Sequence, residues 1–176
     1  MADIEQKRRF RYAVGYMIEQ EGSGIVERLV RDGTYSKFGV RNSWIPNKDL
    51  EQLTRPQAEE LLEEKEWRFR NYHKIEDVLT PPAKIFDTQI LFSPEVAIGK
   101  AKEALISLDY QQVNRNGRLD ALTRDLIEAT EPDEFLDQYV LELESFVIEN
   151  YEGKKALMKR VSNRPYKNVN ASSTTL

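Results

Sequence analysis

The sequence contains no cysteine and only one histidine, His73. Without cysteine there are no thiol nucleophiles and no disulfide bonds, and with a single histidine we also set aside Ser–His–Asp triads. A zinc site would need carboxylates for all of its other protein ligands, so we expect neither a metal nor a cofactor. Any chemistry must therefore depend on carboxylates, hydroxyls, amides or lysine.

The chain also lacks long apolar runs and blocks of one charge. No stretch of about 18 apolar residues is present, and we therefore expect no membrane span. Residues 1–9 are charged but are not followed by an apolar core, so we expect no secretory signal. The 26 basic and 30 acidic residues give a net charge of −4 without a basic block, which argues against nucleic-acid binding.

Helical periodicity dominates the front of the chain. An apolar stripe at Phe10, Val14 and Met17 predicts a first helix that runs from about residue 4 to the glycine-rich residues 22–24. Residues 25–45 lack this period and carry short apolar pieces between glycines, which predicts a small β-hairpin.

Further helices are expected after the hairpin. Thr54 and Gln57 have the spacing of a capping box, and Pro56 suits the first turn of a second helix. Turn signals and apolar periodicity predict helices that start near residues 80 and 93, and others at about 121–129, 134–150 and 154–161. The fold class is therefore expected to be mainly α with a small β-hairpin, an α+β arrangement.

Glu21 is the residue that most suggests a chemical role. It continues the apolar stripe and therefore shares the buried face of the first helix at its C-terminal end. Partial burial and the negative end of the helix dipole both favour the neutral form of a carboxyl group, as a general acid requires. Periodicity alone fits a glutamate at a frayed helix end at least as well.

The hairpin region supplies hydroxyl groups and one acid, namely Asp32, Thr34, Tyr35 and Ser36. An enzyme that cleaves glycosidic bonds needs an acid on one side of the bond and a group that holds water on the other. Asp32 and Ser36 are candidates for the second role if the hairpin folds over Glu21. Turns use the same residue types, so this signal is weak by itself.

Several motifs, in their order along the chain, resemble those of glycoside hydrolase family 108. Glu21-Gly22-Ser23 followed by residues 32–40 resembles its opening motif, which runs Glu-Gly-Gly, a short polar loop, and Thr-x-Tyr-Gly-Ile. The later motifs of the family are similar to Leu53-Thr54 with Ala58 and Trp67, Leu79-Thr80-Pro81-Pro82-Ala83 with Phe86-Asp87, Asn116-Gly117 with Leu122-Thr123, and residues 159–164. The resemblance spans roughly residues 8–165.

This family comprises phage endolysins and related N-acetylmuramidases with a lysozyme-like domain. The resemblance implies cleavage of the β-1,4 bond between N-acetylmuramic acid and N-acetylglucosamine in bacterial peptidoglycan. Glu21 would protonate the leaving oxygen, and Asp32 or Ser36 would position water or steady the oxocarbenium-like centre. The substrate-binding residues implied are Gly22, Thr34, Tyr35, Phe38, Trp67 and Asp87, although Trp67 also suits the core and Asp87 a structural role.

The resemblance also suggests an organisation and a setting. Residues 1–92 would form the catalytic half, residues 93–166 a helical half that resembles a peptidoglycan-binding element and packs with the first as one unit, and residues 167–176 a polar tail. The implied partner is peptidoglycan, and we expect a monomer. It would be made in the host cytoplasm and reach the cell wall in the periplasm through a holin-type pore or in a virion.

Four residues depart from the family pattern. Ser36 replaces the threonine before the Tyr-Gly-Ile element, which is a mild change. Ser23 replaces the second glycine, Leu91 replaces a polar asparagine, and Asp120 replaces a glycine of the binding turn. These departures leave Glu21 untouched, but they support an alternative: a catalytically silent, peptidoglycan-binding virion or secretion-system protein of the same fold. A helical adaptor of a phage tail or secretion complex is a more distant alternative.

Overall fold

The computed structural model describes residues 2–22, 24, 26–28, 34–46 and 49–165. In chain order the main elements are α1 (Ala2–Glu21), β1 (Glu27–Arg28), β2 (Tyr35–Lys37), β3 (Val40–Arg41), α2 (Arg55–Leu62), α3 (Thr80–Leu91), α4 (Pro94–Ser107), α5 (Ala121–Ala129), α6 (Pro132–Asn150) and α7 (Lys155–Ser162). Short 3₁₀ segments cover Asn42–Trp44, Leu50–Gln52 and Tyr72–Lys74, and a π-helix covers Glu63–Arg68.

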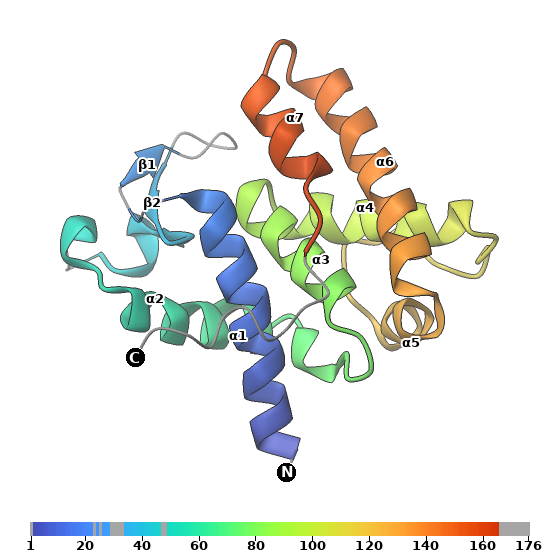
Figure 1. Ribbon diagram of the computed structural model, residues 1–176, viewed down its shortest axis with the longest axis horizontal. Coiled ribbons are helices and arrows are strands. Elements are labelled where there is room, and N and C mark those ends of the chain that lie inside the picture. The colour runs from blue at the N-terminus through green and yellow to red at the C-terminus, as the bar shows by residue number, and fades with distance from the viewer. Residues whose placement is uncertain (1, 23, 25, 29–33, 47–48, 166–176) are drawn as a thin grey trace.

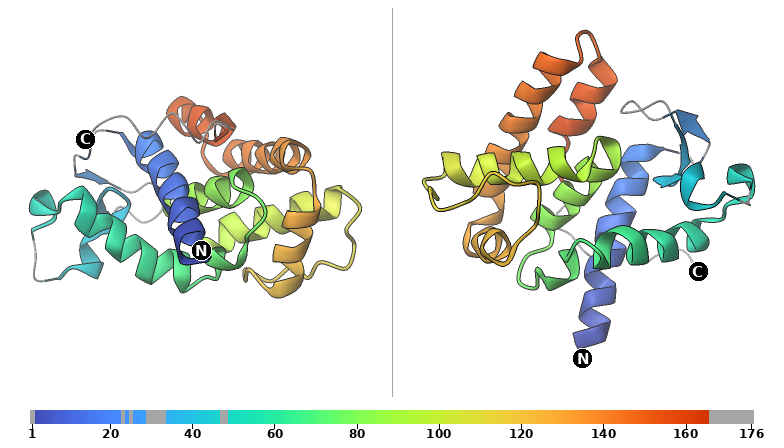
Figure 2. Two further views of the ribbon diagram at one scale, coloured as in Figure 1. Left: turned by 60° about the horizontal axis from the view of Figure 1, so that its bottom comes forward. Right: turned by 180° about the vertical axis from the view of Figure 1, so that it is seen from behind.

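The expected fold class is confirmed, because the described residues form a mainly helical protein with one small antiparallel sheet. α3 lies between two groups of elements (Figures 1 and 2). On one side of it are α1, α2 and the sheet, and on the other are α4, α5, α6 and α7. The sheet lies beside the C-terminal end of α1, so the hairpin and Glu21 occupy the same region.

α1 forms for the reasons that the sequence indicated. Phe10, Val14 and Met17 are all buried, and the helix packs along α3. It ends where Gly22 adopts a positive φ of 94° and donates its N–H to the Ile18 carbonyl oxygen at 3.1 Å. This left-handed residue is the usual C-terminal cap of a helix, and it leaves Glu21 as the last helical residue.

The sheet has the strand order β1-β2-β3 with both pairs antiparallel. Lys37 pairs with Val40, so the turn between β2 and β3 consists of Phe38 and Gly39, with φ values of 53° and 79°. Two positive φ angles in a two-residue turn suit the right-handed twist of a hairpin. A Cβ on Gly39 would lie 2.9 Å from Cγ2 of Ile90, so the glycine lets the turn press closely on α3.

α2 begins at the predicted capping box, in which Thr54 and Gln57 bond each other's backbone. Its C-terminal end continues into the π-helix, which places Trp67 beside the rings of Phe10, Tyr72 and Phe86 at centroid distances of 5.3 to 5.7 Å. These rings join α1, the π-helix and α3 in one aromatic cluster.

α3 is the central helix, and all twelve of its residues are buried. Proline residues occupy its first turn, as predicted. Its polar members include Lys84 and Asp87, whose burial requires that they be paired. α4 follows directly, and the Ser93 hydroxyl accepts from the Val96 N–H at its start.

A buried lysine organises the loop between α4 and α5. The Lys102 ammonium lies 2.8 Å from Oδ1 of Asn114, 2.7 Å from Oδ1 of Asn116 and 2.8 Å from Oδ2 of Asp120. Burial alone would raise the pKa of Asp120, but hydrogen bonds from Lys102 and Thr123 hold it well below its usual range. Asp120 thus both caps α5 and anchors this loop.

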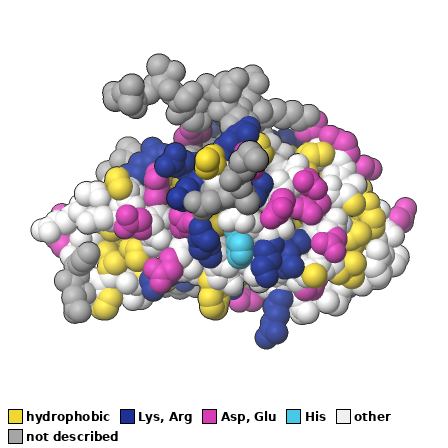
Figure 3. Space-filling model, turned by 90° about the horizontal axis from the view of Figure 1, so that it is seen from below, with side chains coloured by type: hydrophobic (Ala, Val, Ile, Leu, Met, Phe, Trp, Pro, Cys, Tyr) yellow, Lys and Arg dark blue, Asp and Glu magenta, His cyan; other side chains and the backbone are white. Residues whose placement is uncertain are grey.

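The hydrophobic core is continuous from α1 to α7. The face seen in Figure 3 mixes basic, acidic and hydrophobic side chains, and charges of both signs lie near each other. None of the described helices is both long enough and apolar enough to cross a membrane.

Candidate active site

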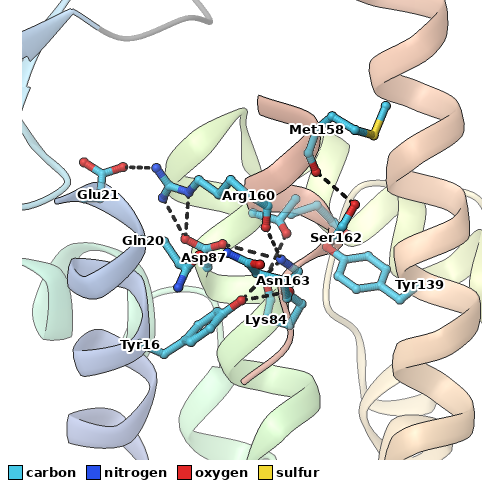
Figure 4. A network of polar contacts seen from close by, with 12 residues as sticks. Tyr16, Gln20, Glu21, Lys84, Asp87, Tyr139, Met158, Arg160, Ser162 and Asn163 are labelled. Carbon is cyan, nitrogen blue, oxygen red and sulfur yellow. Dashed lines mark hydrogen bonds and ion pairs between the residues drawn. The ribbon is translucent and has the colours of Figure 1, made fainter. Parts of the chain in front are cut away.

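Glu21 lies at the C-terminal end of α1 with its side chain 10% exposed. Its carboxylate accepts a hydrogen bond from Nη1 of Arg160 at 2.8 Å. Arg160 belongs to α7, 139 positions further along the chain, so the two ends of the fold meet at this contact (Figure 4). The burial predicted for Glu21 from its place on the helix stripe is therefore found together with a cation that the stripe did not reveal.

Asp87 of α3 holds the same guanidinium from the other side. Nη2 and Nε of Arg160 donate to its Oδ1 at 2.7 and 3.2 Å, and its side chain is only 1% exposed. Arg160 thus bridges two carboxylates that come from α1 and α3 (Figure 4).

Lys84 lies one helical turn before Asp87 and contacts both Asp87 and the backbone of Arg160. Its ammonium donates to the Arg160 carbonyl oxygen at 2.9 Å and to the Tyr16 hydroxyl at 3.4 Å, and it lies 3.8 Å from Oδ2 of Asp87. Tyr16 donates in turn to the Asn163 carbonyl oxygen at 2.9 Å. These contacts attach the C-terminal part of α7 to α1 and α3, and they set the position of Arg160.

Burial and charge act on the cluster in opposite directions. Burial lowers the pKa of Lys84, the Asp87 carboxylate opposes this and the charge of Arg160 adds to it, and together these effects lower the pKa to about 8. Burial would also lower the pKa of Arg160, but the carboxylates of Asp87 and Glu21 raise it above its ordinary value. Arg160 therefore remains charged, whereas Lys84 can lose its proton in mildly alkaline solution.

The cluster combines a partly exposed carboxyl group with a permanent cation. Such a carboxyl group at the protein surface can exchange protons with a bound molecule, and a neighbouring guanidinium favours its ionised form. The sequence argument for Glu21 considered burial and the helix dipole alone. The structure adds Arg160, which acts against the neutral form.

Asp87 was expected among the substrate-binding residues, and the structure corrects this. Its side chain is buried against Arg160 and Lys84, so it does not reach a surface where a glycan could touch it. Arg160 joins it to Glu21.

Trp67 was also expected to bind substrate, and this is wrong as well. The side chain is 2% exposed because the π-helix turns it into the aromatic cluster with Phe10, Tyr72 and Phe86. Neither face of its ring is available to stack on a sugar.

The hairpin residues alternate between the two faces of β2. Tyr35 is 54% exposed, whereas Ser36 is 1% exposed and its hydroxyl has no hydrogen-bond partner among the described residues. The expectation that Ser36 holds water in an open cleft is therefore not met, because its side chain points to the interior. Asp32, the other candidate for this role, lies outside the described residues.

The remaining predicted residues lie near the end of α1 or on the hairpin. Gly22 is exposed, and Thr34 is half-buried. The Phe38 ring is also half-buried, and it packs against Gly24 and the core with the Lys37 ammonium 5.5 Å from its centroid. Tyr35 is the aromatic residue of this group that offers an open ring, so it remains the predicted sugar-stacking residue.

Sequence reasoning missed Arg160 and Lys84 as members of the site. Arg160 was noted only as part of the closing motif. Lys84 carried a usable signal, because a lysine at i and an aspartate at i+3 in a helix with no other charged residue indicate a buried ion pair. Among the described residues, no group of three or more histidine and carboxylate side chains is arranged to hold a metal ion.

Comparisons of the chain with protein-family models, with curated proteins and with solved structures find no match.

Proposed function

We propose that the protein is a peptidoglycan hydrolase, an N-acetylmuramidase of the phage-endolysin type in which Glu21 protonates the leaving oxygen of the glycosidic bond. The observation that carries this proposal is the meeting of three separate motifs. Glu21 comes from the opening motif of the resemblance, Asp87 from its Phe-Asp motif and Arg160 from its closing motif, and they form one hydrogen-bonded cluster. Motif residues that are far apart in sequence are expected to converge where they share a task.

The surroundings of Glu21 also support an acid role. The carboxyl group is largely buried at the end of a helix, next to an exposed glycine that gives a ligand close access to the backbone. An antiparallel sheet with an exposed tyrosine lies beside the same helix end. Carboxyl groups are the proton donors that glycosidases use, and this chain offers one without a metal or thiol.

Release of reducing sugars from purified Gram-negative sacculi tests the proposal, with the wild type compared with Glu21→Gln. We expect cleavage by the wild type and a loss of at least about a hundredfold in the variant, because general acid catalysis contributes on that scale. Glu19→Gln is the matched control, since Glu19 lies on the same helix but is exposed. Mass spectrometry of the products should show N-acetylmuramic acid at the new reducing ends.

Equal activity of wild type and Glu21→Gln would remove Glu21 from the mechanism. The alternative, a silent peptidoglycan-binding virion or secretion-system protein, is favoured by one observation, namely the ion pair that stabilises Glu21 as a carboxylate. It predicts that folded wild-type protein sediments with sacculi but releases no reducing ends.

A further inference from the structure

We infer that Asp87 is a positioning residue that shares the guanidinium of Arg160 with Glu21 and so leaves Glu21 able to take up a proton. The inference rests on the proposed function, in which Glu21 must be protonated before it can act. It assigns a purpose to a buried aspartate that the proposed reaction does not itself use.

The hydrogen bonds of Arg160 are divided unequally between the two carboxylates. Asp87 accepts two of them, from Nη2 and Nε, whereas Glu21 accepts one, from Nη1. Asp87 therefore orients the guanidinium plane, and its own side chain is buried. Arg160 stays in place and charged when the charge of Glu21 changes.

The Asp87 carboxylate makes proton uptake at Glu21 easier than it would be in a simple pair with Arg160. Asp87 offsets part of the guanidinium charge that stabilises ionised Glu21, and a like charge near a carboxyl group raises its proton affinity. Glu21 accepts one bond from Arg160 and Asp87 accepts two, and the Glu21 side chain is 10% exposed against 1% for Asp87. Glu21 is therefore the carboxyl group of the two that can exchange a proton with a ligand.

The other titratable groups that face the cluster come from three helices. Lys84 of α3 lies behind Asp87, Tyr16 of α1 lies against the Lys84 ammonium, and Tyr139 of α6 is held protonated because burial raises its pKa far above the ordinary value. Lys84 is thus the second positive charge, and it opposes the effect of Asp87 on Glu21.

Asp87→Asn tests the inference, because asparagine keeps the acceptor oxygen for Arg160 but removes the negative charge. Both the loss of repulsion and the undivided guanidinium should stabilise the Glu21 carboxylate. The alkaline limb of the activity profile on sacculi should therefore move to lower pH by about one unit. Activity should fall by up to about tenfold on the alkaline side of the wild-type optimum and recover toward the wild-type value in acid.

Lys84→Met should move the same limb in the opposite direction, because it removes a positive charge. Asp137→Asn is the control for net charge, since Asp137 is exposed and pairs with Arg164 away from the cluster. Carbon-13 NMR of labelled glutamate, with the Glu21 signal assigned by its absence in Glu21→Gln, should show the same shifts in the titration midpoint of Glu21 without any substrate.

The outcomes separate the two ideas. An unchanged Glu21 midpoint in folded Asp87→Asn overturns the inference, as does an equal loss of activity at every pH. A wild type that cleaves no glycan contradicts the proposed function, and the NMR titration then still decides whether Asp87 sets the proton affinity of Glu21.

Discussion

Lys84 shows most clearly how single residues set the properties of this fold. It lies in a helix whose residues are all buried, and its ammonium donates to the Arg160 carbonyl oxygen and the Tyr16 hydroxyl. Burial lowers its pKa from 10.5 to about 8. The charged form is therefore less stable in the folded protein than in the unfolded chain.

This shift predicts a pH dependence of stability. Below about pH 8, Lys84 is protonated in both the folded and the unfolded protein. Between about pH 8 and 10.5 it is protonated only in the unfolded protein. The contribution of Lys84 to the unfolding free energy therefore rises with pH in that window. The unfolding free energy of wild type minus that of Lys84→Met should grow by about 2 kcal/mol between pH 7.5 and 10. Urea unfolding followed by tryptophan fluorescence measures this difference in unfolding free energy. A difference that does not change with pH would contradict the lowered pKa of Lys84.

At the scale of elements, the hairpin turn depends on one glycine. Gly39 combines a φ of 79° with a Cβ position 2.9 Å from Ile90 and 3.2 Å from the Met17 sulfur. The turn between β2 and β3 therefore packs closely on α3 and α1, the two helices that carry Asp87 and Glu21. This close packing places the hairpin beside the C-terminal end of α1.

We expect Gly39→Ala to lower the unfolding free energy by about 2 kcal/mol or more, from backbone strain and overpacking. Gly15→Ala is the matched comparison, because Gly15 lies within α1 with nothing within 4 Å of its Cβ position. That change should stabilise the protein by about 0.5 to 1 kcal/mol through helix propensity. Chemical denaturation of both variants measures the contrast, and equal effects would argue against the close approach at Gly39.

The elements were largely predictable because their signals are local. The stripe of α1, the capping box of α2 and the prolines of α3 each act within a few residues. The site was only partly predictable. Glu21 lies on a periodic face, but its pairing with Arg160 depends on how α7 packs, and Trp67 turned inward because a π-helix changed the direction of its side chain.

At the scale of the whole molecule, one continuous core joins both halves of the chain. Trp44 and Trp67, which give the fluorescence signal, both belong to the first half. Helices α4, α5, α6 and α7, which contribute to the circular dichroism signal, belong to the second half. Urea unfolding followed by tryptophan fluorescence and by far-ultraviolet circular dichroism should therefore give superimposable transitions. Separate midpoints would mean that the halves unfold independently in spite of their shared core.

The contact between Glu21 and Arg160 also has a consequence for synthesis. A ribosome adds the residues of α1 well before those of α7, because 139 positions separate the two side chains. The charged cluster therefore cannot assemble until α7 has been made, however early α1 folds. A chain that stops before residue 160 keeps its glutamate but never gains the guanidinium.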